Sequence, residues 1–198
     1  MQSSVFAWEV LWEETARTRP LCVDLDGTLV STDTLWESVL SLFRRRPWLL
    51  LIAPLWLIGG RASFKRHVAM RTVLDPAALP YREDLLAALR RLKLSGRKLV
   101  LATAADREIA ESVAQHLGLF DEVFSSDGRA NLRASVKCER LARTYAASGF
   151  DYVGDSHADL SVFERATRGF LVSSTSRLAE LARRKGNVLV VSLRPSLI

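Results

Sequence analysis

Apolar residues follow two different patterns along the second half of the chain. Short continuous apolar runs are typical of buried strands, and apolar residues at every third or fourth position are typical of amphipathic helices. From residue 81 onward the two patterns take turns, which predicts a parallel sheet with helices on both faces. The expected strands cover 21–23, 98–102, 121–124, 151–153, 169–172 and 188–191, and the expected helices cover 82–94, 107–117, 134–147, 158–165 and 176–185.

The pattern between the first strand and the start of this alternation is helical. Apolar residues recur at helical spacing over 35–43, and a second, strongly apolar helix is expected over 47–58. A third, basic helix is expected over 62–73, and residues 5–16 can form a short amphipathic helix before the first strand. The predicted fold class is therefore α/β, a doubly wound parallel sheet with a small all-helical insertion after its first strand.

Length and composition narrow the class of protein. The chain has 198 residues, enough for one compact domain with a modest insertion. Its two cysteines, Cys22 and Cys138, fit no metal-binding or CxxC pattern, which indicates small apolar residues in a reducing compartment. No secretory signal is visible, and the apolar run 48–58 is too short for a bilayer, which needs about 20 apolar residues. The expected location is the cytoplasm, with association at a membrane surface left open.

The formal net charge of +6 raises the question of an anionic partner. Seven basic residues flank the apolar run: Arg44, Arg45, Arg46, Arg61, Lys65, Arg66 and Arg71. The aromatic residues here lie among Leu, Ile and Pro rather than in a stacking platform, and the chain has no RNA- or DNA-binding motif. A nucleic-acid partner is therefore not expected.

Ligands of doubly wound sheets bind beyond the carboxyl ends of the strands, so residues that directly follow a strand are the candidates for chemistry. The first strand is followed by Asp24, Leu25, Asp26, Gly27 and Thr28. Two carboxylates one residue apart leave the sheet on the same side if the chain turns at Gly27, where glycine permits the turn. Such a pair suits a hard cation, and a division of work between a nucleophile and an acid/base. The alternative interpretation is an ordinary Asp-Gly turn.

The second long strand is followed by Thr103, Ala104, Ala105 and Asp106. One interpretation is a helix capping box, in which Thr103 and Asp106 satisfy backbone N–H groups at the start of a helix. The other places the Thr103 hydroxyl and the backbone N–H of Ala104 on a phosphate group at the helix N-terminus. The residues alone leave these two interpretations open.

Two further candidates lie near the ends of later elements. Lys137 is in the first turn of a predicted helix, where a cation opposes the helix dipole. Alone it is more typical of a solvated surface lysine, although an anion in front of it would explain the position.

Asp155 and Asp159 follow a strand and can both face a metal ion. Ser156 and Asp159 also match a capping box, and His157, in a polar loop, is more often a bystander than a base.

Together these residues resemble the four motifs of the haloacid-dehalogenase-like superfamily. The motifs are Asp-x-Asp-Gly-Thr, a strand-end Thr, a Lys, and Gly-Asp-Ser-x-x-Asp, and they occur in this order between about residues 20 and 175. The resemblance implies a Rossmann-like core over 1–30 and 80–198. It also implies a helical cap over 31–79 that closes over the site and selects the substrate.

The same resemblance implies a phosphatase, that is, a phosphoric monoester hydrolase that depends on Mg²⁺. Asp24 would attack phosphorus and form an aspartyl-phosphate, while Asp26 would protonate the leaving oxygen and then activate water. The implied metal ligands are Asp24, the backbone carbonyl of Asp26 and Asp155, with Asp159 in support. The implied phosphate-binding groups are Thr103, Ala104 and Lys137.

The expected cap is apolar and basic at once. One interpretation is a hydrophobic hairpin buried against the core. The other is a surface that docks on an anionic membrane or grips a lipid tail, because Trp and Arg at the edges of an apolar helix suit the membrane interface.

A closer resemblance favours the second interpretation. The sequences DTLWES (33–38), RRRPWL (44–49), FKR (64–66), LPYRED (79–84) and LATAADR (101–107) are similar to the phosphatase-like domain found N-terminal to some UbiA-type membrane prenyltransferases. This implies a membrane prenyltransferase as partner or fusion, and a substrate such as a polyprenyl-linked sugar phosphate. A catalytically idle accessory module of such a transferase and a phosphatase of small soluble metabolites stay open as alternatives. The chain is expected to be free-standing or part of a longer protein.

Overall fold

The computed structural model describes residues 18–34, 48, 51, 55, 58, 74–126, 134–172 and 176–191. The helix expected over 5–16 lies outside these ranges. So does most of the cap expected over 31–79, and its bounds stay a prediction. Within the described ranges, no helix is long and apolar enough to cross a membrane.

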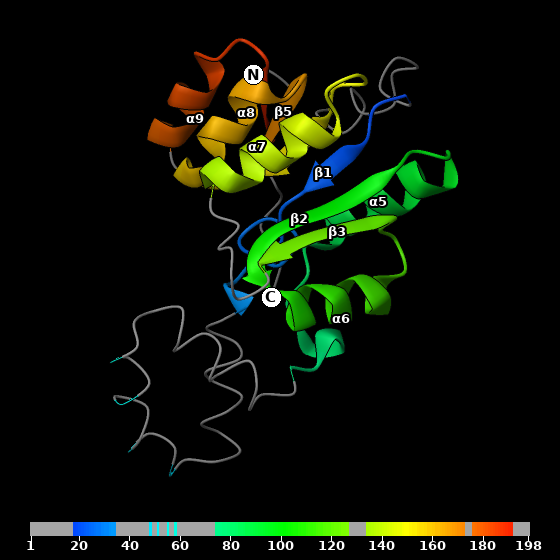
Figure 1. The fold of residues 1–198 in the computed structure, drawn as a ribbon, viewed down its shortest axis with the longest axis vertical. Coiled ribbons are helices and arrows are strands. Elements are labelled where there is room, and N and C mark those ends of the chain that lie inside the picture. The colour runs from blue at the N-terminus through cyan, green and yellow to red at the C-terminus, as the bar shows by residue number, and fades with distance from the viewer. Residues whose placement is uncertain are drawn as a thin grey trace.

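Six parallel strands form one sheet in the order β3-β2-β1-β4-β5-β6 (Figure 1). Their bounds are β1 Leu21–Val23, β2 Leu99–Asp106, β3 Glu122–Ser126, β4 Asp151–Gly154, β5 Arg168–Val172 and β6 Val188–Val191. Short apolar runs separated by helices cannot pair as hairpins, so each connection crosses over and the sheet becomes parallel. The predicted α/β fold class, a doubly wound parallel sheet, is confirmed.

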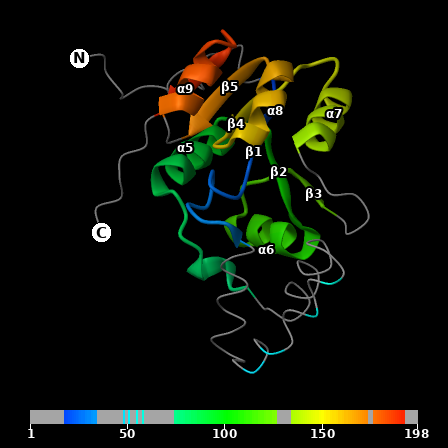
Figure 2. The same ribbon diagram turned by 90° about the vertical axis from the view of Figure 1, so that its left-hand side faces the viewer.

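Helices cover both faces of the sheet. The α-helices whose bounds are described are α5 Glu83–Leu94, α6 Arg107–Leu117, α7 Ala134–Thr144, α8 Leu160–Arg165 and α9 Ser176–Arg183, and the 3-10 turns with described bounds are η3 Pro76–Ala78 and η4 His157–Asp159. Figures 1 and 2 show α5 and α6 on one face of the sheet and α7, α8 and α9 on the other. The helices expected over 82–94, 107–117, 134–147, 158–165 and 176–185 are therefore present, with ends that shift by a few residues.

Residues of each strand alternate between the two halves of the core. In β1, Leu21 and Val23 pack with α5 and α6, whereas Cys22 packs with α7, α8 and α9. All three are fully buried, which explains why the strand is a continuous apolar run rather than an alternating one. Cys22 and Cys138 are buried free thiols, so the expectation that they pack as small apolar residues is confirmed.

The second strand runs further than its sequence pattern predicts. β2 extends to Asp106, and its pairing with β3 shifts register between Ala102 and Asp106. The helix that follows has Asp106 as its N-cap, whose side chain accepts from the backbone N–H of Glu108. The capping-box interpretation of Thr103 with Asp106 is therefore wrong, because Thr103 lies inside the strand and Asp106 caps the helix by itself.

The strand order reverses between β1 and β4, which pair in parallel with Leu21 opposite Asp151 and Val23 opposite Val153. Helices leave to opposite faces at such a switch point, so a crevice opens beyond the carboxyl ends of the two strands. Asp24 directly follows β1, and Asp155 directly follows β4. The fold thereby brings together two carboxylates that are far apart in sequence.

Candidate active site

The loop after β1 turns sharply at Gly27, which has a positive φ of 74°. A Cβ atom there would lie 2.1 Å from Oδ2 of Asp155, so only glycine fits both the backbone angle and the space. The side chain of Arg82 donates two hydrogen bonds to the backbone oxygen of Gly27, at 3.2 and 3.0 Å. This loop therefore packs against Asp155 and is held by Arg82 at the start of α5, and the expected turn at Gly27 is present.

The loop after β4 is built around the carboxylate of Asp159. A Cβ atom on Gly154 would lie 2.7 Å from Cγ of Asp159, so glycine lets that side chain approach the backbone. Oδ2 of Asp159 accepts from the backbone N–H of Ser156 at 3.1 Å and from its hydroxyl at 2.7 Å. The capping box expected for Ser156 and Asp159 is present. His157 is exposed beside it, as expected for a bystander.

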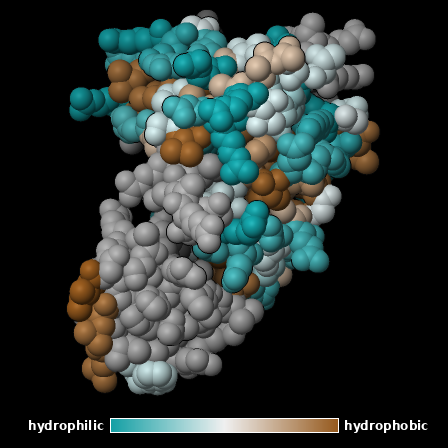
Figure 3. All heavy atoms as spheres, in the orientation of Figure 1, coloured by the Kyte–Doolittle hydropathy of each residue, from teal (hydrophilic) through white to brown (hydrophobic). Residues whose placement is uncertain are grey.

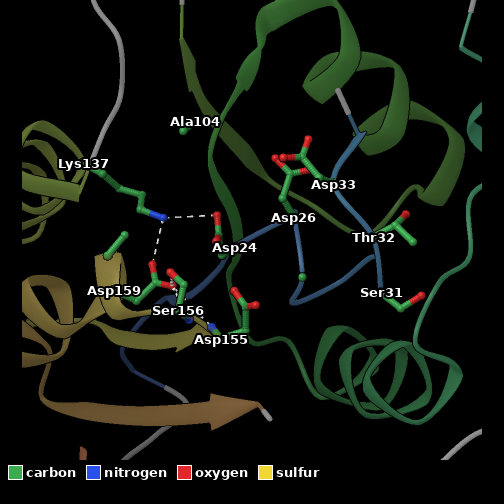
Figure 4. Close-up of a pocket in the computed structure, with 12 residues that line it drawn as sticks. Asp24, Asp26, Ser31, Thr32, Asp33, Ala104, Lys137, Asp155, Ser156 and Asp159 are labelled. Carbon is green, nitrogen blue, oxygen red and sulfur yellow. Dashed lines mark hydrogen bonds and ion pairs between the residues drawn. The ribbon is translucent and has the colours of Figure 1, made fainter. Parts of the chain in front are cut away.

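Three carboxylates and one lysine meet beyond the ends of β1 and β4 (Figure 4). One oxygen each of Asp24, Asp155 and Asp159 lies within 4.8 Å of the others. Nζ of Lys137, on α7, donates to Oδ1 of Asp24 and to Oδ1 of Asp159, both at 3.1 Å. Lys137 is only 4% exposed, so its interpretation as a solvated surface lysine is wrong. An anionic group in front of the helix explains its position.

Of the three carboxylates, Asp159 accepts the most hydrogen bonds. It accepts five hydrogen bonds, from Lys137, the Tyr152 hydroxyl, the backbone of Asp155, and the backbone and hydroxyl of Ser156. A carboxylate offers about four lone-pair sites. Asp159 therefore has little capacity left for a metal ion, and it holds Lys137 and the Asp155 loop in place.

Asp24 and Asp155 have more capacity for a ligand. Oδ1 of Asp24 accepts from Lys137, and Oδ2 has no hydrogen-bond partner among the described residues. Asp155 accepts on Oδ1 from the Thr28 hydroxyl at 3.3 Å. These two side chains can supply carboxylate oxygens from adjacent strand ends, and oxygen ligands are those that Mg²⁺ prefers. The donor set fits the expected metal ion.

The buried cluster contains more negatively than positively charged side chains. Burial raises the pKa of Asp24 to about 8, even though Lys137 acts in the opposite direction, and the neighbouring charges of Asp159 and Asp26 raise it further. Burial and the charge of Asp159 likewise raise the pKa of Asp155 to about 6. Burial alone would lower the pKa of Lys137, but Asp24 and Asp159 raise it above its ordinary value. One lysine does not neutralise three carboxylates, and a divalent cation would.

The cluster opens into a cavity of about 570 Å³. Its lining residues are Asp24, Asp26, Gly27, Ser31, Thr32, Asp33, Ala104, Lys137, Asp155, Ser156, Ala158 and Asp159. The segment 31–33 was missed in the sequence, where it begins the predicted cap. The sequence feature that could have identified this segment as part of the site is its position shortly after the turn at Gly27. The cavity is large enough for a phosphate group with part of the molecule that carries it.

Thr103 and Ala104, the two residues of β2 that were expected to bind phosphate, lie at different positions relative to the cavity. Thr103 is fully buried, and its hydroxyl oxygen accepts the backbone N–H of Ala105 at 2.9 Å. Ala104 lines the cavity, whereas Thr103 is not among its lining residues. The shift in register after Ala102 turns this part of the strand out of the ladder toward the site. The structure brings Ala104 to the cavity wall, with Thr103 behind it.

Asp26, the expected acid/base, lines the same cavity and is half-buried. Its Oδ1 accepts the backbone N–H of Thr34 at 2.7 Å, which fixes the carboxylate against the start of the segment that leads to the cap.

Two residues that the sequence did not single out also shape the site. Tyr152 donates to Asp159 at 2.6 Å, and Arg82 holds the backbone of Gly27. A tyrosine in an apolar strand was the available signal, since a buried hydroxyl needs a partner.

Comparison with known proteins identifies the family. The model of the haloacid dehalogenase-like hydrolase family matches residues 21–164. The chain belongs to this family. The prediction of an enzyme with the haloacid-dehalogenase-like core is therefore confirmed, and the matched segment contains the loops after β1 and β4 as well as Lys137.

A curated relative from Sinorhizobium fredii, the uncharacterized protein y4nM, is 39% identical to the chain over 180 residues. The match covers 90% of the chain and 34% of y4nM, so the chain spans about a third of the length of this relative.

Solved structures share the fold at lower identity. A Bordetella pertussis protein of unknown function has a TM-score of 0.60 at 19% identity, covering 89% of this chain and 99% of that one. A phosphoserine phosphatase in its apo form has a TM-score of 0.60 at 17% identity, covering 88% and 94%. A phospho-aspartyl intermediate analogue of phosphoserine phosphatase has a TM-score of 0.58 at 17% identity, with the same coverage. At these identities the likeness is one of fold.

Proposed function

We propose that this haloacid dehalogenase-like hydrolase cleaves phosphate monoesters, with Asp24 as nucleophile, Asp26 as general acid/base and Mg²⁺ as cofactor. The proposal rests above all on Asp24, which lines a strand-end cavity with one oxygen on a buried lysine and the other unpaired within the described chain. A carboxylate held in this way can attack a group that enters the cavity.

The first step is attack of an Asp24 oxygen on phosphorus. The bond from phosphorus to the substrate oxygen breaks, and Asp26 donates its proton to that leaving oxygen. Lys137 and the backbone N–H of Ala104 stabilise the phosphoryl oxygens while the phosphoryl group transfers. The products of this step are an alcohol and an aspartyl-phosphate on Asp24.

The second step returns the enzyme to its starting state. Asp26, now ionised, takes a proton from a water molecule as that water attacks phosphorus. The bond from phosphorus to the Asp24 oxygen breaks, and inorganic phosphate leaves. Asp24 and Asp155, with the backbone carbonyl of Asp26, are the proposed metal ligands, and Asp159 supports them. A bound Mg²⁺ would offset the negative charges of the phosphate and of the nucleophile, which otherwise repel each other.

Two observations support this chemistry beyond the geometry. Structures of similar fold include phosphoserine phosphatase and a phospho-aspartyl intermediate analogue of it, which is the type of intermediate proposed for Asp24. The raised pKa of Asp24 also implies that the carboxylate needs a cation before it can act as a nucleophile at neutral pH.

The test is turnover of p-nitrophenyl phosphate with and without Mg²⁺, in the wild-type chain and in Asp24→Asn. We expect metal-dependent turnover that falls by on the order of 10⁴ or more in the variant, because an essential nucleophile is lost. Asp84→Asn is the matched control, since Asp84 is exposed on α5, outside the cavity lining. Turnover that survives Asp24→Asn would sink the proposed mechanism. Failure of the wild type to bind Mg²⁺ or a phosphate analogue would favour an idle accessory module.

The substrate proposed within this class is lipid-linked, a phosphomonoester on or near a polyprenyl-linked sugar. It is supported by the apolar sequence of the cap and by the resemblance to domains that precede UbiA-type prenyltransferases. The measurement is kcat/KM for a sugar phosphate with and without a short polyprenyl chain. Equal or better values for the soluble compound would contradict it and favour a small-metabolite phosphatase.

The partner proposed for the chain is a membrane prenyltransferase, on the same polypeptide or separate. The match to y4nM is compatible with such an arrangement, because it leaves about two thirds of that relative outside the shared segment. Copurification of the tagged chain with a UbiA-type transferase in mild detergent tests it, and recovery of the chain alone would count against it.

A further inference from the structure

Four cap residues in the described part of the chain expose large apolar side chains. Trp48, Leu51, Leu55 and Ile58 are 59%, 83%, 61% and 81% exposed; we call these four the cap stripe. Trp48 and Leu51 have 3-10 backbone, and Leu55 and Ile58 have α-helical backbone. At these positions the cap is not a hairpin buried against the core.

The cap stripe lies at one edge of the molecule. Figure 3 shows a brown edge at the lower left, the colour of the leucine and isoleucine side chains of the stripe. In Figures 1 and 2 the short cyan segments that mark these residues lie on the outer side, away from the sheet. They are at the same end of the molecule as the carboxyl ends of β1 and β2. A surface that bound the stripe would therefore lie at the end of the molecule that carries the active-site cavity.

The sequence around the stripe is strongly cationic. Residues 38–74 contain seven Lys or Arg and no Asp or Glu. The whole chain has a formal net charge of +6, so without this segment it would carry −1. The net positive charge of the protein thus comes from the segment that also carries the exposed apolar side chains. Apolar side chains with cationic neighbours are the combination that binds an anionic lipid surface.

We propose that the cap stripe docks the chain onto the surface of an anionic lipid bilayer. The apolar side chains enter the boundary between headgroups and acyl chains, and the flanking arginines and lysines contact the lipid phosphates. A second copy of the chain fits less well, because each copy would bring a segment with seven cationic and no acidic residues to the contact. The proposal does not depend on the catalytic activity, since docking can be measured without turnover.

The test is sedimentation of the 198-residue chain with vesicles of phosphatidylcholine alone, or with a third of the lipid replaced by phosphatidylglycerol. We expect binding to the anionic vesicles that weakens as salt is raised, because screening shortens the reach of the charges. The variant Leu51→Ser/Leu55→Ser/Ile58→Ser should bind these vesicles at least about tenfold more weakly. The matched control is Leu94→Ser/Leu189→Ser, which removes exposed leucines of the core, and it should bind like the wild type.

Thermal unfolding of each variant checks that the loss is not a loss of fold. Undiminished binding by the triple variant, equal binding to neutral vesicles, or no binding by the wild type would each overturn the proposal. Stripe-dependent dimerisation without vesicle binding, measured by light scattering, would overturn it in favour of a contact between two copies.

Discussion

Each end of the sheet holds a buried cluster of charged side chains, and the two clusters differ in the ratio of carboxylates to cations. At the amino end, Asp151 pairs with Arg97 at 2.5 Å and with Arg19 at 3.3 Å. At the carboxyl end, Lys137 pairs with Asp24 and Asp159, while Asp155 has no ion pair among the described residues. The amino end matches its single carboxylate with cations, whereas the carboxyl end keeps a surplus of negative charge.

This difference separates a structural cluster from a functional one. Burial lowers the pKa of Arg97, but the adjacent Asp151 offsets much of that cost, so the pair is stable as it stands. At the carboxyl end, burial and like charges raise the pKa of two carboxylates, and the cluster is stabilised only when something positive arrives. A surplus of buried charge in a cavity is therefore the more informative sign of function. Mutations at the two ends should have opposite consequences.

After Asp24→Asn, the largest effect is expected from Lys137→Met. The variant loses the cation that the phosphoryl oxygens require, so turnover should fall by about 10²–10³. It also leaves Asp24 and Asp159 buried without their partner, which should destabilise the metal-free chain by on the order of 3 kcal/mol. Turnover of p-nitrophenyl phosphate and urea unfolding measure the two effects.

The control for this variant is Lys98→Met, which removes the same charge from an exposed pair. Lys98 and Glu122 lie 2.5 Å apart with side chains 43% and 39% exposed. Such a pair is worth less than about 1 kcal/mol, and it lies away from the site. Equal losses of stability in both variants would show that the buried lysine is no more important to the fold than a surface one.

Asp151→Asn is expected to damage the fold and spare the chemistry. It leaves Arg97 buried without a counter-charge, so stability should fall by roughly 3 kcal/mol, measured by urea unfolding. The kcat of the folded fraction should stay close to the wild-type value, because the residue lies at the opposite end of the strand from Asp155. Asp24→Asn is the comparison at the other end: it removes a surplus charge and should not lower the stability of the metal-free chain. The same loss of stability in both variants would contradict the contrast.

The sequence allowed one of these clusters to be predicted and not the other. Asp24 and Asp155 are recognisable because they directly follow apolar strands, where parallel sheets place their ligands. Arg97 comes two residues before β2, Asp151 is the first residue of β4, and the two are 54 residues apart. Their contact depends on the register that sets Leu21 opposite both Leu99 and Asp151, and no local pattern reports that register.

The same limit explains the errors in the site itself. Thr103 follows an apolar run without a turn signal, so the strand was expected to end there, but it continues to Asp106. Lys137 is typical of a surface lysine by its helix position, and only the packing of α7 over the strand ends places it on Asp24. Order and type of the elements were therefore readable from the sequence, while side-chain partners across elements were not.

Mg²⁺ should stabilise the chain through the carboxyl end alone. At a free concentration of 100 times its dissociation constant, a single bound ion adds about 2.7 kcal/mol to the free energy of unfolding. The effect should be lost in Asp24→Asn and kept in Asp151→Asn, because only the first variant removes a proposed ligand. Thermal unfolding with increasing Mg²⁺ measures it. Equal stabilisation of both variants would place the ion elsewhere.

The pH dependence of the metal-free chain follows from the same carboxylates. The pKa values of Asp24 and Asp155 rise from 3.8 to about 8 and about 6, so the native chain keeps protons that the unfolded chain has released. Stability from this source is complete below about pH 4 and is lost as pH rises through 6 to 8. Saturating Mg²⁺ should flatten the profile, and Asp24→Asn should remove its upper part. A metal-free stability that rises from pH 5 to 8 would contradict this assignment.

The smallest effect is expected from Tyr152→Phe, which removes one of the five hydrogen bonds that Asp159 accepts. Asp159 keeps four other hydrogen bonds, so we expect a loss of about 1 kcal/mol in stability. Mg²⁺ binding should also weaken, by less than tenfold, because the Asp155 loop is held less firmly. The matched control is Tyr145→Phe, whose hydroxyl donates to Glu122 at 2.6 Å, away from the site. A similar loss of stability in both variants, with weaker Mg²⁺ binding only for Tyr152→Phe, would identify Tyr152 as a positioning residue. Unchanged metal binding in both would leave it a purely structural one.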